Sequence, residues 1–106
     1  MSANSKAPNI LVIQVDEMTP NVLPAYGHPL VKTPHLDGLA AEGVVFENAY
    51  CNFPLCVPSR ASMMVGRLAH NIGSWDNATE MPASIPTLAH HLRHAGYHTV
   101  LCGKMH

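Results

Sequence analysis

A nearly continuous apolar run over residues 9–15 is the feature that most constrains what this chain can fold into. Asn9 opens the run, Gln14 interrupts it, and the other members are aliphatic and mostly β-branched. A continuous rather than alternating apolar pattern is typical of a strand buried on both faces of a parallel sheet. Asp16 follows directly, where that strand should end. The run therefore predicts a parallel sheet that begins near the start of the chain.

Helix signals recur at intervals along the rest of the chain. Thr33 as a cap, Pro34 at the first helical position and Gly43 at the end mark the clearest helix. Gly66 and Gly96 are placed to stop two later helices. Helices are therefore expected over residues 33–43, 59–65 and 86–95.

Strand-like segments alternate with these helices. Residues 44–49 are expected to form a strand or an extended segment and residues 97–102 a strand, whereas residues 67–83 lack periodicity and are expected to form a loop. This order predicts an α/β fold in which helical crossovers join parallel strands. In such sheets ligands gather outside the carboxyl ends of the strands. Asp16 and Lys104/His106 would occupy those ends, and Cys56 would reach the same edge from a helix N-terminus.

Composition bounds the class of protein and its partners. The 106 residues, 47% of them hydrophobic, suit one domain of modest size, with residues 1–8 as a flexible polar start. Six Lys and Arg against seven Asp and Glu give a net charge of −1. No basic run follows a nucleic-acid backbone or an anionic membrane surface. We therefore expect neither a nucleic-acid nor a membrane partner.

The cysteines and the chain start favour a cytoplasmic location. The apolar run at residues 10–15 is shorter than the core of a signal peptide, and no segment is long enough to span a bilayer. Cys51, Cys56 and Cys102 are an odd number without the spacing of a disulfide framework. A reducing compartment fits this cysteine usage best.

The segment Cys56-Val57-Pro58-Ser59-Arg60 carries the chemistry of the chain. A phosphate-binding loop of the Cys-x5-Arg type needs five intervening residues whose N–H groups wrap the anion. Here three residues intervene, and one is a proline without an N–H. That kind of phosphatase loop is excluded by its geometry.

The same segment, with the following residues 61–67, resembles the signature of the type I sulfatases of the alkaline phosphatase superfamily. The resemblance implies the amino-terminal part of an alkaline-phosphatase-like sandwich, with a mostly parallel sheet flanked by helices. It also implies that a formylglycine-generating enzyme oxidises Cys56 to Cα-formylglycine. Hydrated, that group would be a geminal diol: one hydroxyl attacks the sulfur of a small-molecule sulfate ester and the other expels sulfate. A serine could accept the sulfuryl group but could not eliminate it.

The resemblance further assigns metal ligands. Asp16 corresponds to the first metal ligand of the family and would bind the metal together with the modified Cys56. The hard carboxylate oxygen favours Ca²⁺, with Mg²⁺ or Mn²⁺ as alternatives. Glu17 stands where many sulfatases have a second Asp, so it is a doubtful ligand.

Four more residues take roles by the same resemblance. Arg60 would neutralise and position the diol, and Lys104 would grip the sulfate and diol oxygens. His106 would hydrogen-bond the diol or the substrate. Asn77 would contact the sulfate, although a plain turn residue is an equal interpretation.

The stretches 76–78, 85–97 and 103–106 look most like bacterial choline-sulfatases and their close relatives. Full sulfatases carry further metal ligands and another Lys and His after the part that this chain resembles. We therefore expect the isolated chain to be incomplete and inactive, and a homo-oligomeric full-length protein is compatible with the sequence. Two alternatives stay open: a phosphonate or phosphate ester hydrolase of the same superfamily, and a non-catalytic truncated remnant.

Overall fold

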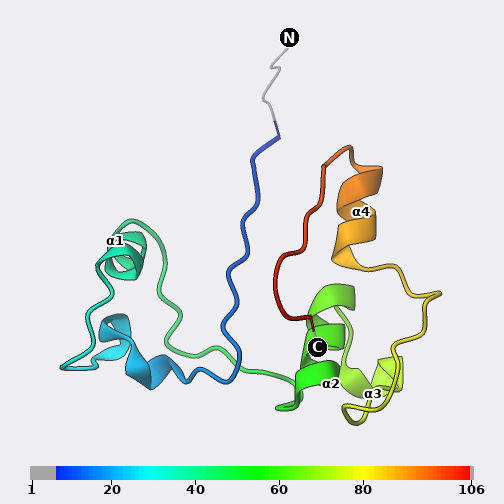
Figure 1. Cartoon of the computed structure of the whole chain (residues 1–106), viewed down its shortest axis with the longest axis horizontal. Coiled ribbons are helices and arrows are strands. Elements are labelled where there is room, and N and C mark those ends of the chain that lie inside the picture. Colours follow the sequence, from blue (N-terminus) through cyan, green and yellow to red (C-terminus); the bar gives the residue numbers. More distant parts are fainter. Residues whose placement is uncertain (1–6, 106) are drawn as a thin grey trace. The chain divides into compact units, whose positions relative to one another are not determined.

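A computed structural model describes residues 7–105, and these divide into two compact units with the boundary between Asn48 and Ala49. Most of the expected flexible start, residues 1–8, and the whole of His106 lie outside the described residues. The regular elements are four α-helices and two 3₁₀ helices, shown along the chain in Figure 1. None of the helices described is both long enough and apolar enough to cross a bilayer.

The expected α/β fold with its mostly parallel sheet is wrong for this chain. Residues 7–105 contain helices and turns but no strand. Residues 9–15 and 97–102, predicted as strands, and residues 44–49, predicted as a strand or an extended segment, have the residue preferences of a strand but no ladder in the structure. A strand is stabilised by hydrogen bonds and side-chain packing with its neighbours, which local sequence does not supply. The first run is accordingly exposed, with Leu11 at 83% and Ile13 at 70%.

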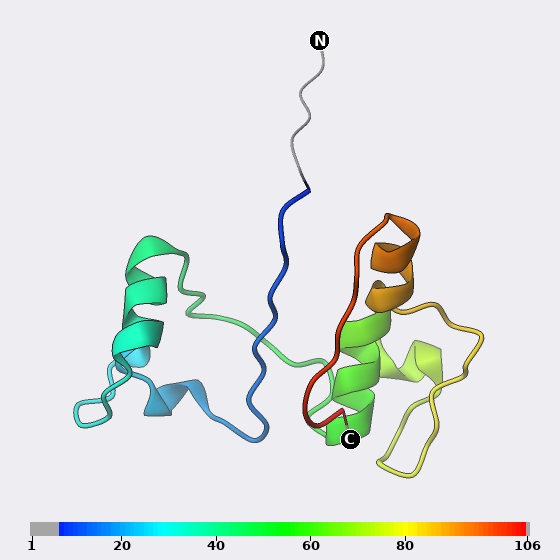
Figure 2. The same cartoon turned by 45° about the horizontal axis from the view of Figure 1, so that its top comes forward.

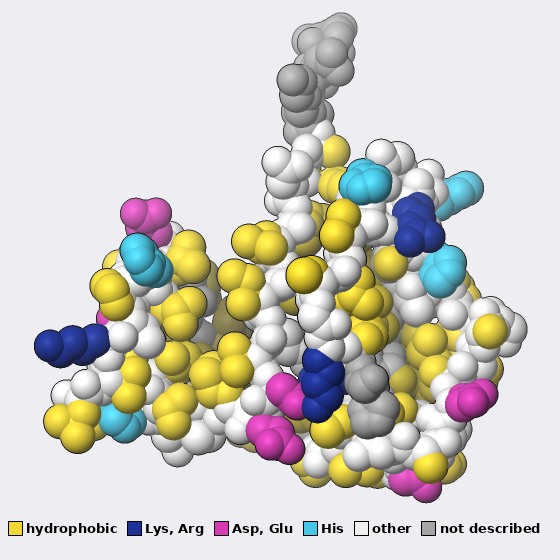
Figure 3. All heavy atoms as spheres, in the orientation of Figure 1, with side chains coloured by type: hydrophobic (Ala, Val, Ile, Leu, Met, Phe, Trp, Pro, Cys, Tyr) yellow, Lys and Arg dark blue, Asp and Glu magenta, His cyan; other side chains and the backbone are white. Residues whose placement is uncertain are grey.

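The first unit contains two 3₁₀ helices, η1 (Pro20–Val22) and η2 (Pro24–Tyr26), followed by α1 (Pro34–Glu42). The predicted helix is confirmed, with Pro34 as its first residue and Gly43 after its last, but the Thr33 side chain makes no cap bond to the helix backbone. The Thr33 hydroxyl donates to the Asp37 carboxylate over 3.0 Å, and this acidic group lies in the first turn, where the helix dipole favours it. Apolar side chains lie on the visible surface of this unit (Figure 3).

The second unit contains α2 (Cys56–Val65), α3 (Ala69–Ile72) and α4 (Leu88–His94). Helix α2 packs against both α3 and α4 (Figure 2). The prediction found the C-terminal half of α2 but began it three residues late, and α3 lies inside the expected loop 67–83. Pro58 fits into the first turn because the N–H groups there have no partner within the helix.

Helix α4 is the third predicted helix, slightly shortened at both ends. Thr87 precedes it, and the Thr87 N–H donates to His90 Nδ1 over 3.2 Å while the Thr87 hydroxyl lies 2.8 Å from the same nitrogen. A histidine thus fills the place that Glu or Gln takes in the usual capping box. Basic side chains gather over the end of α4 in Figure 3. The helix dipole favours positive charge at this end.

Candidate functional site

Cys56 is the first residue of α2 and is half-buried. Leu55 before it is extended, and the Ser59 N–H closes the first turn by donating to the Leu55 carbonyl over 2.9 Å. Pro58, which is fully buried, packs the same turn into the unit. The structure therefore places Cys56 at the start of a helix, as the sequence predicted. The packing of Pro58 holds the backbone of this turn.

Arg60 joins α2 to the C-terminal segment. Its side chain is only 8% exposed, and Nη1 donates to the Lys104 carbonyl oxygen over 3.1 Å. The segment that follows α4 runs beside α2 in both views (Figures 1 and 2). This charged hydrogen bond connects two separate motifs, Cys-x-Pro-Ser-Arg and Gly-Lys-x-His. His106, the last predicted residue of the second motif, lies outside the described residues.

Asn77 reaches α2 from the loop between α3 and α4. Its side-chain oxygen accepts a hydrogen bond from the Val57 N–H over 3.0 Å, one residue after Cys56. Asp76 shapes the loop locally, because one carboxylate oxygen accepts the Ala78 N–H at 2.9 Å and the Thr79 hydroxyl at 2.7 Å. The Thr79 hydroxyl, and after it the Ala78 N–H, hold the pKa of Asp76 below its usual value. The sequence pointed to Asn77 but gave no role to Asp76.

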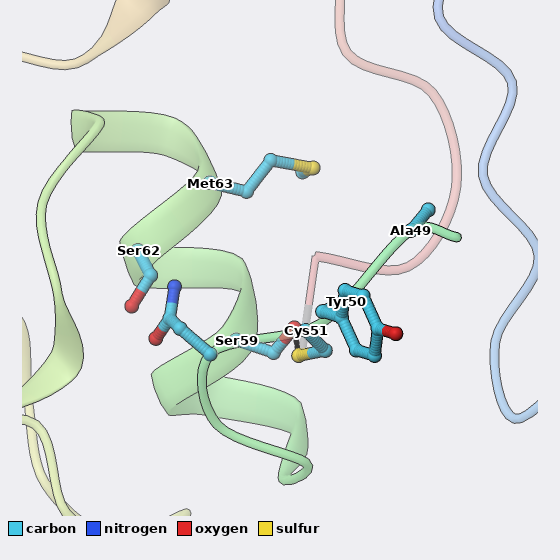
Figure 4. Close-up of a pocket in the computed structure, with 7 residues that line it drawn as sticks. Ala49, Tyr50, Cys51, Ser59, Ser62 and Met63 are labelled. Carbon is cyan, nitrogen blue, oxygen red and sulfur yellow. Dashed lines mark hydrogen bonds between the residues drawn. The ribbon is translucent and has the colours of Figure 1, made fainter. Parts of the chain in front are cut away.

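Two hollows flank α2. One has a volume of about 160 Å³ and is lined by Val57, Arg60, Ala61, Met64, Met81, Thr87 and Met105. The other, of about 410 Å³, opens beside Ser59 and Ser62 (Figure 4). There Cys51 Sγ lies 3.1 Å from Ser59 Oγ and donates to the Phe53 carbonyl over 3.0 Å. Cys51 therefore belongs to the surroundings of the motif, a contact that its place in the sequence does not reveal.

The predicted metal ligands belong to different units: Asp16 and Glu17 to the first, Cys56 to the second. Asp16 lies at a turn directly after the extended run, and Glu17 adopts a left-handed backbone with φ of 55°. Between residues 7 and 105 no three His, Cys, Asp or Glu side chains gather where they could hold a metal ion. Ca²⁺ needs six to eight oxygen ligands, so the described residues do not complete a metal site by themselves.

Comparison with known proteins is consistent with this arrangement of motifs. A family model described as Sulfatase matches residues 8–106. The chain is 48% identical to a choline-sulfatase of Rhizobium meliloti over 93% of its own length and 19% of that protein. It is 40% identical to arylsulfatase A of Bos taurus over 98% of the chain and 22% of the relative. A third relative, an N-acetylglucosamine-6-O-sulfatase of Bacteroides thetaiotaomicron, is 37% identical over 96% of the chain and 18% of that protein.

The chain spans about a fifth of the length of these curated relatives. No solved structure matches it significantly. The shared sequence includes every motif described above, because the family match runs from residue 8 to residue 106.

Proposed function

The chain belongs to the sulfatase family, and from this premise we propose that it is the amino-terminal part of a hydrolase that cleaves sulfate monoesters. The observation that carries the proposal is the Arg60–Lys104 hydrogen bond of 3.1 Å, which unites the Cys56 motif with the Gly-Lys-x-His motif. Both motifs carry positive charge beside a helix start. A sulfate ester, which is an anion, needs that arrangement.

Cys56 is the proposed nucleophile after oxidation to formylglycine. Hydrated, that group would supply one hydroxyl to attack sulfur and a second hydroxyl whose deprotonation releases sulfate. The chain's own contribution is positional: α2 fixes the backbone of Cys56, and the buried Arg60 holds a positive charge one turn away. Fixed positive charge near a transferring sulfuryl group stabilises the charge that develops on its oxygens.

Lys104 and Asn77 are the proposed contacts of the sulfate group. Lys104 has an exposed side chain, and its backbone is held by Arg60. The Asn77 oxygen accepts the Val57 N–H, so the amide NH₂ is the end that could donate to an anion. His106 stays a predicted donor to the substrate.

Asp16 stays a predicted metal ligand, and Glu17 a doubtful one. Because the described residues do not complete a Ca²⁺ site, the proposal requires oxygen ligands from outside them. Calorimetric titration of Ca²⁺ into the full-length protein and its Asp16→Ala variant tests the assignment, since equal affinities would remove Asp16 from the ligand set.

The substrate class is the finer part of the proposal. The identity with a choline-sulfatase favours the sulfate ester of a small alcohol. A cytoplasmic location and maturation by a formylglycine-generating enzyme complete the proposal. Parallel assays of an aryl sulfate and an aryl phosphonate with the full-length protein distinguish a sulfatase from the related phosphonate hydrolase.

The first experiment is mass spectrometry of the protein from its native host, on the intact chain and on the peptide that contains Cys56. Formylglycine at Cys56 in a polypeptide longer than 106 residues supports the proposal. An unmodified thiol in a chain that ends at His106 supports a non-catalytic remnant. Sulfate release that survives Cys56→Ala in the full-length protein would contradict the assigned nucleophile.

A further inference from the structure

Asp76 is connected, through the turn that contains Asn77, to the first turn of the helix that carries Cys56. Asp76 Oδ1 accepts the Ala78 N–H and the Thr79 hydroxyl, at 2.9 Å and 2.7 Å. These bonds enclose Asn77 in a tight turn. From that turn the Asn77 oxygen accepts the Val57 N–H over 3.0 Å. A local turn in one loop is therefore connected to the first turn of α2.

The Val57 N–H is a donor that α2 cannot satisfy itself. The first N–H groups of a helix have no carbonyl one turn earlier, and such donors are usually satisfied by a capping side chain. Leu55, at the cap position, makes no side-chain bond to the helix. Asn77 therefore acts as a cap supplied from twenty residues away, and it holds the residue next to Cys56.

We propose that Asp76 and Asn77 are positioning residues: Asp76 fixes the turn, and Asn77 fixes the first turn of α2 and with it the backbone of Cys56. This inference rests on the proposed function for its catalytic meaning, because only then is Cys56 a nucleophile. The hydrogen bonds that connect Asp76, Asn77 and α2 do not depend on that function. A group that must attack sulfur in line needs a defined backbone, and small displacements of such a group are costly.

Charge and geometry favour Asp76 over a simple polar loop residue. Its carboxylate makes charge-assisted bonds, which are shorter and stronger than neutral ones. The hydrogen bonds that lower the pKa of Asp76 are the same ones that enclose Asn77. Hydrogen bonds within residues 76–79 therefore stabilise the turn independently of its contact with α2.

Amide hydrogen exchange of the ¹⁵N-labelled chain tests the inference without any sulfatase assay. Asn77→Ala should speed exchange of the Val57 amide about fivefold, the usual effect of losing a helix cap. Asp76→Ala should speed it in the same direction although Asp76 does not bond Val57. Asp76→Asn should restore only part of the slow exchange, because its amide oxygen can accept the same two bonds but without the charge that strengthens them.

The Gly66 amide, which donates to the Ser62 carbonyl at the other end of α2, is the internal control for general unfolding. Asn77→Asp is the matched conservative variant, since it keeps an acceptor for Val57. A Val57 amide that is unprotected in the wild-type chain, or that responds only in step with Gly66, would overturn the inference. Failure of the sulfatase proposal would leave these exchange results unchanged, so the two can be told apart.

Discussion

The two units of the chain contain helices of similar length, yet these helices are stabilised differently. Helix α1 has nine residues and α2 has ten, but α1 has no buried residue whereas α2 has four. The buried residues among 7–105 all lie in the second unit: Pro58, Arg60, Ala61, Ser62, Ala69, Ile72, Ser74 and Thr87. Helix α2 is thus stabilised by packing, whereas α1 depends on its local hydrogen bonds, including that from Thr33 to Asp37. The motif residues with the strongest predicted roles lie where the backbone is fixed by tertiary contacts.

Truncating one apolar side chain in each unit should give the largest contrast. The Ile72 side chain is 5% exposed, so Ile72→Ala should lower the free energy of unfolding by about 2–4 kcal/mol. Leu39, 63% exposed, should cost less than about 0.5 kcal/mol in the same change. Urea unfolding followed by amide exchange in each unit measures both. Equal effects would show that the burial difference does not control stability.

Removing the Arg60 guanidinium should release the C-terminal segment and leave the first unit unaffected. Arg60→Gln loses a charged hydrogen bond to the Lys104 carbonyl, a contact worth roughly 1.5–3 kcal/mol. We expect cleavage after Lys104 by a lysine-specific protease to become about tenfold faster or more. Cleavage after Lys32, in the first unit, is the internal reference. Unchanged cleavage after Lys104 would show that the bond does not hold the segment.

The terminal glycines of α1 and α2 should tolerate alanine differently. Gly66 has φ of +65° with open space around an added Cβ, so Gly66→Ala should cost about 1 kcal/mol from backbone strain alone. At Gly43, where φ is −111°, an added Cβ would lie 2.9 Å from the Leu39 carbonyl oxygen, so the helix end must shift. Circular dichroism should show a loss of stability for Gly66→Ala and a local loss of helix α1 for Gly43→Ala. Gly66→Asn should recover part of the stability, since Asn tolerates this backbone better.

Acid should loosen the Asp76 turn, with a smaller effect than the substitutions above. Hydrogen bonds in the folded chain lower the pKa of Asp76 below its ordinary 3.8, so the ionised carboxylate stabilises the turn above that pH. This contribution is lost as the pH falls through the lower, folded value. An NMR titration should show the Asp76 carboxyl titrating below pH 3.8, and the protection of the Val57 amide from exchange, relative to that of the Gly66 amide at the same pH, should fall at the acidic end. Val57 exchange that follows the same pH course in Asp76→Asn would contradict this origin.

Local signals predicted local structure well and non-local structure poorly. The proline that starts α1 and the glycines that follow α1 and α2 act on one or two neighbouring residues, and these predictions are confirmed, whereas Thr33 precedes α1 without a side-chain cap bond. The strands depended on partners distant in sequence, so residue preference alone misplaced them. Helix α3 was missed because four residues give no recognisable period.

The candidate site divides in the same way. One motif indicated Cys56 and Arg60 and a second indicated Lys104, and the structure brings Arg60 and Lys104 together. Neither the Asn77–Val57 bond nor the Cys51–Ser59 contact has a sequence signal, because each joins a loop to α2 through loop geometry. The roles of Asp16, Glu17 and His106 stay predictions.

The exposed run at residues 10–15 has a consequence for the colloidal behaviour of the purified chain. A mostly β-branched, exposed stretch that pairs with no strand among residues 7–105 is the kind of segment through which separate molecules associate. A net charge of −1 provides little mutual repulsion to oppose that association. We therefore expect turbidity that rises with protein concentration near neutral pH, and replacing Leu11 and Ile13 by Lys should keep the solution clear.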